Sequence, residues 1–331
     1  MRGGVDLGGT KIEAVIVAAN NDVRGQQRLS TPTEGGPADV AEQILAALRA
    51  AADAAGVEPR ALVRIGIGSP GDVDETTGEV SGARNLPGWE GSFGLGQHVS
   101  DALGPPVFVG NDVNVAVLAE VRLGAARSYG SALGVWWGTG VGGAVVIEGE
   151  LWSGRGAAGE IGHMVVRRGG ARCSCGRRGC MEAYAGRAAM ERRARKAHKR
   201  GQHTDLFRLM HRHDRDRLTS GVWERALRHG DNLAGKLLDR AVKALGTGIA
   251  SAVNLLDPEA VILGGGLGDR LGPRYADAIQ SEMAKHLFVD QNPPDFRLTE
   301  LGDLGGAIGA SLLGAAAPVQ TPPRDAARAT T

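Results

Sequence analysis

Four side chains able to bind a metal ion lie close together in the middle of the sequence. They are one imidazole and three thiols, from His163, Cys173, Cys175 and Cys180. Three thiolates and one imidazole form a closed tetrahedral ligand set, which is typical of structural zinc sites and leaves no open position for catalysis. An odd number of closely spaced cysteines is also a poor disulfide framework. We therefore predict a structural Zn2+ that holds a loop; three reduced, free cysteines are the alternative.

Two glutamates, Glu160 and Glu182, flank this cysteine loop. A loop held by a metal would direct both carboxylates towards one pocket. Carboxylate and amide acceptors fixed on a stiff loop suit the many hydroxyl groups of a sugar. The spacing therefore predicts a sugar pocket beside the metal.

A third acid, Asp112, follows an apolar segment predicted as a strand and precedes a predicted helix. Sheets in α/β proteins place ligand-facing groups at this position. With Asn111 beside it, Asp112 could bind and deprotonate a hydroxyl group. The alternative is a helix N-cap, a role that aspartate fills well.

Glycine is unusually frequent, with 52 among 331 residues. Some of these glycines lie in three turns, at residues 8–10, 138–143 and 264–268. Backbone N–H groups without a neighbouring Cβ form concave anion sites. The first two turns alone could be tight hairpins, but together with the third they favour nucleotide binding. Asp6 could hold Mg2+ directly or through water. The candidate nucleotide-binding residues are Asp6, Gly8, Gly9, Thr10, Lys11, Gly138, Thr139, Gly140, Gly264, Gly265 and Gly266.

Other nucleotide folds fit less well. The chain has no GxxxxGK[ST] motif, which disfavours a P-loop protein. Residues 138–143, GTGVGG, match the dinucleotide pattern GxGxxG, but a strand rather than a helix is predicted after them.

The elements that position these groups alternate between strands and helices, which indicates an α/β architecture. Strands are predicted at residues 4–7, 12–17, 63–66, 107–109, 133–137, 144–147 and 260–263, and helices at 39–55, 114–123, 232–256 and 305–313. A strand–turn–strand pattern opens each half, so we predict two related halves. We expect the last helix to pack against the first half.

The overall charge is balanced, with 38 Lys+Arg against 37 Asp+Glu, so no general polyanion-binding surface is indicated. Residues 187–217 are the exception, with 11 Lys/Arg against 4 Asp/Glu and four histidines. We interpret them as a solvated helical segment; a patch for a polyanion such as nucleic acid or polyphosphate is the alternative, although Phe207 is its lone aromatic residue. Charged residues near the N-terminus argue against a secretory signal, and we predict a cytoplasmic protein without a membrane span.

Over about residues 4–316 the sequence resembles the ROK family of sugar kinases and regulators, most closely its bacterial glucokinases. The motifs that carry the resemblance are DLGGTK at 6–11, SPG at 69–71, NLPGW at 85–89, GND at 110–112, GTGVGG at 138–143, EIGH at 160–163, CSCGRRGC at 173–180 with Glu182, and GGG at 264–266. The cysteine motif after EIGH is highly specific, whereas the glycine turns alone are not.

The resemblance implies an actin-like ATPase (ribonuclease H-like) fold, with two α/β domains and ATP and sugar in the cleft between them. The implied small domain comprises residues 1–114 plus about 300–317. The large domain comprises 115–299 with the zinc loop and the basic segment, and residues 318–331 form a disordered tail.

The resemblance also implies roles for individual residues. Asp112 would be the general base that takes the proton of the sugar 6-hydroxyl, with ATP and Mg2+ as cofactors, and His163 would bind both sugar and zinc. The implied sugar contacts are Gly71, Asn85, Asn111, Asp112, Glu160, His163 and Glu182. The implied reaction is ATP-dependent phosphorylation of glucose to glucose 6-phosphate.

Alternatives within this resemblance are a kinase for N-acetylglucosamine, N-acetylmannosamine, mannose or fructose, a polyphosphate-using glucokinase, and a non-catalytic sugar-sensing regulator. Family repressors carry an N-terminal DNA-binding helix-turn-helix, whereas this sequence starts directly at the first glycine turn. We therefore expect a kinase without a nucleic-acid partner. The family suggests a homo-oligomer, either a dimer or a tetramer.

Overall fold

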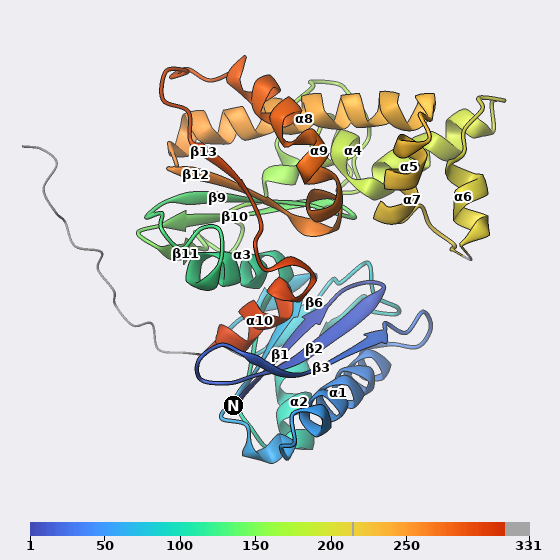
Figure 1. Ribbon diagram of the computed structural model, residues 1–331. Helices are drawn as coiled ribbons and strands as arrows, with labels where there is room; N and C mark the ends of the chain where they lie inside the picture. The colour runs from blue at the N-terminus through green and yellow to red at the C-terminus, as the bar shows by residue number, and fades with distance from the viewer. Residues whose placement is uncertain (214, 315–331) are drawn as a thin grey trace, which may run out of the picture.

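The computed structural model describes residues 1–213 and 215–314, and in these residues two five-stranded sheets lie one above the other with helices around them (Figure 1). The tail predicted at residues 318–331 lies outside the described residues. Each sheet has its own apolar core.

The first sheet has the strand order β3-β2-β1-β4-β8. Its strands are β1 (Arg2–Leu7), β2 (Lys11–Val17), β3 (Val23–Ser30), β4 (Ile65–Ser69) and β8 (Val107–Asn111). The first three strands are antiparallel, and β1, β4 and β8 are parallel. The predicted strand–turn–strand of the N-terminus is confirmed. The strand predicted at residues 63–66 begins two residues later, because pairing with β1 and β8 starts at Ile65, whereas Val63 is exposed.

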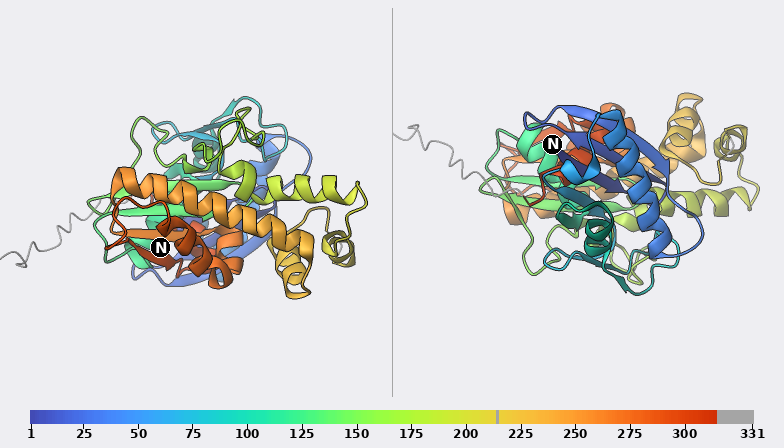
Figure 2. Two further views of the ribbon diagram at one scale, coloured as in Figure 1. Left: turned by 90° about the horizontal axis from the view of Figure 1, so that it is seen from above. Right: turned by 90° about the horizontal axis from the view of Figure 1, so that it is seen from below.

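Helices cover both faces of the first sheet. On one face lie α1 (Pro37–Ala54) and α2 (Leu95–Leu103), visible from below in Figure 2. On the other face lies the last helix, α10 (Gly305–Leu312), as predicted. It packs directly on the strand backbones, because a Cβ at Gly4 or Gly66 would overlap carbonyl oxygens of α10. Only glycine permits such an approach.

The second sheet has the order β11-β10-β9-β12-β13. Its strands are β9 (Ala132–Trp137), β10 (Val141–Ile147), β11 (Glu150–Trp152), β12 (Ala260–Gly264) and β13 (Asp295–Leu298). As in the first sheet, an antiparallel hairpin is followed by parallel pairing of its first strand with a later strand. The shared arrangement agrees with the predicted pair of related halves.

The outer face of the second sheet is covered by α8 (Asn232–Leu256) and α9 (Gly265–Ala284), which cross it in the view from above (Figure 2). Helix α4 (Glu182–Ala185) packs against α8. From one end of this layer extend α5 (Arg187–His198), α6 (Leu206–Arg212) and α7 (Ser220–Arg228) (Figure 1). The basic segment is thus helical in α5 and α6, as predicted.

Helix α3 (Asp112–Leu123) lies between the two sheets. Val115 contacts glycines of the first sheet, whereas Val117 and Val121 join the apolar cluster of the second. The boundary predicted after residue 114 falls inside this helix, so the division into two domains stays a prediction.

Short elements that the sequence pattern did not indicate form the loops. Three short strands, β5 (Asp72–Asp74), β6 (Glu79–Ser81) and β7 (Ser92–Phe93), pair in a small sheet. Single 3-10 turns are η1 (Pro59–Ala61), η2 (Ile161–His163) and η3 (Gly302–Leu304). Within the described part of the chain, no helix is both long and apolar enough to cross a membrane.

Candidate functional site

Asn111 and Asp112 lie where β8 ends and α3 begins. The Asn111 side-chain oxygen accepts hydrogen bonds from the backbone N–H groups of Val113 at 3.0 Å and Asn114 at 3.2 Å. Asn111 is therefore the N-cap of α3, and the alternative of Asp112 in that role is wrong. The Asp112 carboxylate also accepts the Val113 N–H, at 2.9 Å. The cap fixes the start of the helix, and so fixes where Asp112 lies.

Asp112 is in an environment that disfavours its charge. Burial, assisted by the nearby carboxylates of Asp6 and Glu160, raises the pKa of Asp112 to about 6. Burial also raises the pKa of Asp6, and Lys11 opposes that rise. A carboxylate with a pKa near 6 is mostly ionised at neutral pH and still accepts a proton readily. Asp6 lies on β1 and Asp112 follows β8, on either side of β4, so the sheet itself brings them together.

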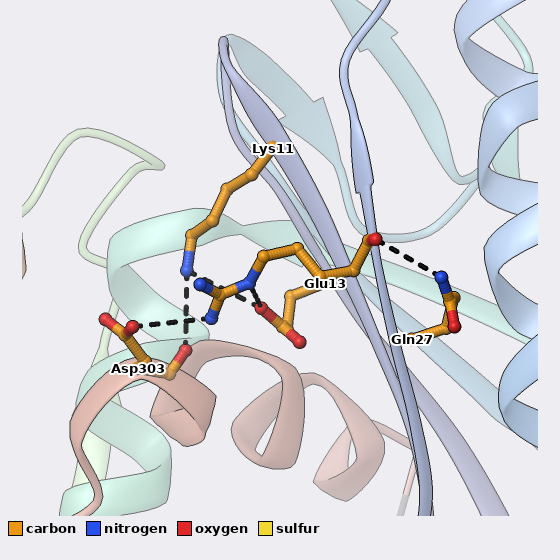
Figure 3. Close-up of polar contacts among 5 residues, drawn as sticks. Lys11, Glu13, Gln27 and Asp303 are labelled. Atoms are coloured by element: carbon orange, nitrogen blue, oxygen red, sulfur yellow. Dashed lines mark hydrogen bonds and ion pairs between the residues drawn. The ribbon is translucent and has the colours of Figure 1, made fainter. Parts of the chain in front are cut away.

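Lys11 belongs to a polar cluster at the start of β2 (Figure 3). Its ammonium nitrogen lies 3.5 Å from the carbonyl oxygen of Asp303 and 3.9 Å from the carboxylate of Glu13. Arg28 bonds to the buried Glu13 carboxylate and to that of Asp303 at 3.3 Å. Next to this cluster, α10 approaches Asp6 so closely that a Cβ at Gly306 would lie 2.9 Å from its carboxyl carbon.

The turn at residues 8–10 is a tight hairpin in contact with a sugar-site candidate. The N–H of Gly8 donates to the carbonyl of Lys11 at 2.9 Å, and Thr10 is exposed at the tip. A Cβ at Gly9 would lie 2.9 Å from the carbonyl oxygen of Asn85. Gly71 has a φ of +96° and packs near Ser81 of β6, at the edge of the same loop region.

The second turn, at residues 138–140, is attached to the start of α5. The Arg187 N–H donates to the Gly138 carbonyl at 3.1 Å, and the Arg187 guanidinium donates to the Thr139 hydroxyl at 2.6 Å. Burial lowers the pKa of Arg187. Gly138 also faces the first turn of α9, since a Cβ there would lie 3.8 Å from the Gly266 nitrogen.

The third glycine run was predicted as a turn between a strand and a helix. In the structure it forms the start of the helix itself. Gly264 is the N-cap of α9, and Gly265 and Gly266 form its first turn. Gly265 has a φ of +85°, and a Cβ there would lie 3.0 Å from backbone atoms of Trp137. The two glycine runs of the second half therefore meet at the ends of β9 and β12.

Glu182 lies between the second turn and the cysteine loop. One carboxylate oxygen accepts the N–H of Val141 at 3.2 Å, and the other accepts the hydroxyl of Ser174 at 2.7 Å. Gly140 leaves the space for this carboxylate, because a Cβ at that position would overlap it. Glu160, by contrast, is exposed and lies 3.8 Å from the outer ring nitrogen of His163.

The four predicted metal ligands come together. The donor atoms of His163, Cys173, Cys175 and Cys180 all lie within 4.8 Å of one another. Cys173 Sγ is 3.8 Å from His163 Nδ1, and Cys175 Sγ is 3.8 Å from Cys180 Sγ. A tetrahedron with Zn–S bonds of about 2.3 Å has S···S edges of about 3.8 Å, so the donor set fits zinc. His163 turns Nδ1 to the thiols and Nε2 to Glu160, which leaves one nitrogen for each of its two predicted roles.

Comparison with known proteins decides the family. Residues 2–317 match the ROK family. The chain belongs to the ROK family. Among curated relatives of this ROK protein, the glucokinase of Thermotoga maritima is 35% identical over 268 residues, which are 80% of this chain and 81% of the relative. An N-acetylgalactosamine kinase of a Shewanella species is 32% identical, over 94% of this chain and 96% of the relative.

The solved structures confirm the predicted actin-like ATPase fold for this ROK protein. A ROK family glucokinase from Streptomyces griseus, in complex with glucose and AMPPNP, superposes with a TM-score of 0.78 at 31% identity. The match covers 94% of this chain and 97% of that chain.

Several polar residues that the structure places at the candidate site were not identified from the sequence. They are Glu13, Arg28, Ser174, Arg187 and Asp303. The position of Glu13 could have indicated a polar contact, because a single carboxylate inside an otherwise apolar strand must find a partner when it is buried. The others are ordinary surface types whose role depends on contacts distant in sequence.

Proposed function

We propose that this protein is a hexose kinase that transfers the terminal phosphoryl group of ATP to the 6-hydroxyl of glucose. The sugar kinase activity is supported by the glucokinase of Thermotoga maritima and by the glucose and AMPPNP complex of the Streptomyces griseus relative. The observation that carries the proposal is Asp112, a half-buried carboxylate just after β8 whose pKa is raised to about 6 by burial and by the charges of Asp6 and Glu160.

Asp112 acts as the general base in this proposal. It accepts the proton of the attacking hydroxyl, and the capped start of α3 keeps its carboxylate in place while it does so. The Asn111 amide N–H2 is still available as a donor, because the cap uses only its oxygen. Sugar hydroxyls would be oriented by Gly71, Asn85, Asn111, Glu160, His163 and Glu182.

The glycine turns bind the nucleotide in this proposal. Residues 8–11 would hold the phosphates from the first sheet, residues 138–140 from the second, and residues 264–266 would face the nucleoside. Asp6 would hold Mg2+, which supplies positive charge that offsets the charge developing on the transferred phosphoryl group. Zn2+ on the four-residue cluster would stiffen the loop that positions His163 and Glu182.

An N-acetylated hexosamine as the substrate is the second candidate, because the Shewanella relative at 32% identity is an N-acetylgalactosamine kinase. A phosphorylation assay with ATP over glucose, mannose, fructose, N-acetylglucosamine and N-acetylgalactosamine decides between them. We expect the highest kcat/KM for glucose, with product phosphorylated at the 6-position by 31P NMR. A higher value for an N-acetylhexosamine would overturn the glucose assignment, and no phosphorylation of any hexose would overturn the kinase and favour a sensor.

Replacing ATP by polyphosphate in the same assay tests which phosphoryl donor the protein uses. The cytoplasmic location and the homo-oligomer stay predictions.

A further inference from the structure

A cavity of about 470 Å3, open to solvent, lies between α5 and α8, away from the candidate site. Basic side chains dominate its lining: Arg193, Lys196 and Arg200 come from α5 and its C-terminal end, and Arg240 comes from α8. A second hollow of about 310 Å3 shares Arg193 and Arg240, so the two are continuous, and adds Lys236 and Asp239. None of the residues that line either hollow belongs to the candidate site.

Within the part of the chain that the structure describes, these cations form no ion pair, unlike other basic residues of the segment. Arg195, on the same helix, pairs with Glu191 at 2.6 Å, and Arg208 pairs with Asp205 at 2.9 Å. Among residues 1–213 and 215–314, no carboxylate oxygen lies within 4.0 Å of the charged nitrogens that line the cavity. Asp239, the one acidic lining residue, is exposed and also acts electrostatically on Tyr275 of α9.

Arg193, which lines the cavity, is held in place by two contacts. Its guanidinium donates to the Ala183 carbonyl at 3.2 Å and lies 4.9 Å from the centre of the Tyr184 ring. Burial lowers the pKa of Arg193, and the charge of the neighbouring Arg240 lowers it further. A partly buried guanidinium among other cations is stabilised by an anion, and phosphate matches its paired N–H donors.

We propose that this cavity binds a small phosphate-bearing anion. Several convergent cations in a hollow of this size suit a phosphate ester or a short phosphoanhydride. A nucleic acid strand is disfavoured, because the one aromatic ring of the segment, Phe207, is buried and packs against His198.

The cavity is connected to the candidate site through α4 and α5. Arg193 binds the carbonyl of Ala183, the residue after Glu182, and the first residue of α5 binds the 138–140 turn. An anion held by Arg193 would therefore be linked through this one side chain to α4, which carries Glu182, and through α5 to the 138–140 turn.

The test is calorimetric titration of the full-length protein, saturated with Mg–AMPPNP, with inorganic triphosphate and separately with glucose 6-phosphate. The double variant Lys196→Gln/Arg200→Gln removes two lining charges, and Arg192→Gln/Lys199→Gln removes two exposed charges of the same segment that do not line the cavity. We expect one binding event per chain, weakened at least about tenfold in the first variant and less than about twofold in the second. Thermal unfolding of both variants verifies that they fold.

Tighter binding of triphosphate would identify a phosphoanhydride ligand, and tighter binding of glucose 6-phosphate a phosphate ester. Absence of binding with both probes would overturn the proposal, as would equal weakening in the two double variants. Because the readout is binding and not turnover, the result does not depend on which hexose the protein phosphorylates.

Discussion

The Glu182 carboxylate accepts a hydrogen bond from the Ser174 hydroxyl at 2.7 Å. Ser174 lies between two of the candidate zinc ligands, and the other oxygen of Glu182 accepts the N–H of Val141 at the second glycine turn. One carboxylate thus joins the cysteine loop to the 138–140 turn. The position of the Glu182 carboxylate therefore depends on Ser174 and on the backbone at Val141.

Removing the Ser174 hydroxyl should weaken sugar binding. A hydrogen bond to a charged group contributes about 1.5–3 kcal/mol, so Ser174→Ala is expected to raise the KM for the sugar about tenfold or more, with zinc content unchanged. Steady-state kinetics measures this. Ser131→Ala is the matched control, because Ser131 donates to the Glu259 carboxylate at 3.4 Å just before β9, at the opposite end of that strand from the 138–140 turn. An unchanged KM in Ser174→Ala would show that this bond does not position Glu182.

Replacing the proposed base should abolish turnover. Asp112→Asn keeps the size of the side chain but cannot accept a proton, and general-base catalysis contributes about 10²- to 10⁴-fold. We expect kcat to fall at least about 10³-fold, with the melting temperature maintained because a disfavoured buried charge is lost. The exposed Asp101→Asn serves as the control. Normal turnover in Asp112→Asn would remove Asp112 from the mechanism.

The raised pKa of Asp112 predicts a pH dependence. As the pH falls through about 6 the base becomes protonated, so kcat/KM of the wild type should decrease below that pH, while the residual activity of Asp112→Asn should not follow this curve. The folded pKa lies above the unfolded value of 3.8, so this group's contribution to the free energy of unfolding decreases as the pH rises from 3.8 to about 6. Profiles of kcat/KM against pH and denaturant unfolding, each between pH 4 and 8, measure the activity and the stability effect. A wild-type kcat/KM that does not change over this range would contradict the role of Asp112 as the base.

The cysteine cluster predicts a bound metal. Purified protein should contain about one zinc per chain by elemental analysis. Cys180→Ser should lose the metal and lower the melting temperature, because Cys180 is fully buried in the loop. Ser174→Ala, in the same loop but without a ligand atom for the metal, should keep it. Full activity of native protein that contains no zinc would refute a structural role for the metal.

The contact between Gly140 and Glu182 predicts a steric effect. Gly140→Ala would place a Cβ on the Glu182 carboxylate, so kcat/KM should fall by about 10²-fold, as displacements of about 1 Å in active sites do. The control is Gly235→Ala inside α8, where no atom lies within 4 Å of the added Cβ. That change should stabilise the protein by about 0.5–1 kcal/mol and leave activity unchanged. Equal activity in both variants would contradict the proposed position of Glu182.

Much of the fold follows from local patterns in the sequence. The helix predicted at residues 232–256 coincides with α8, because its apolar residues recur at helical spacing and Asp231 caps its start with a hydrogen bond to the Ala234 N–H. The strands of the small sheet were missed, because elements of two or three mostly polar residues carry no periodicity. The start of β4 was misplaced because valine is apolar whether exposed or buried, and only tertiary packing determines which.

The candidate site follows from the sequence where its residues belong to compact motifs. The four metal-ligand candidates come from two short segments, and the structure brings their donor atoms together. Arg187 and Asp303 could not be found in this way. Arg187 reaches Thr139 across 48 positions of the chain and Asp303 reaches Arg28 across 275. Such pairings are set by the assembled sheets, and local residue types do not encode them.

The position of α10 has a consequence for how the chain folds during synthesis. This helix is translated about 300 residues after β1, yet it covers the strand backbones at Gly4 and Gly66. The emerging first sheet therefore keeps the part of this face over Gly4 and Gly66 uncovered while the whole second half is made. Contacts of such long sequence separation slow folding, and exposed sheet surface favours aggregation. A ribosome-bound chain that stops before residue 305 should consequently bind chaperones and be cleaved by proteases in its N-terminal half, although every residue of the β1–β2 hairpin is present.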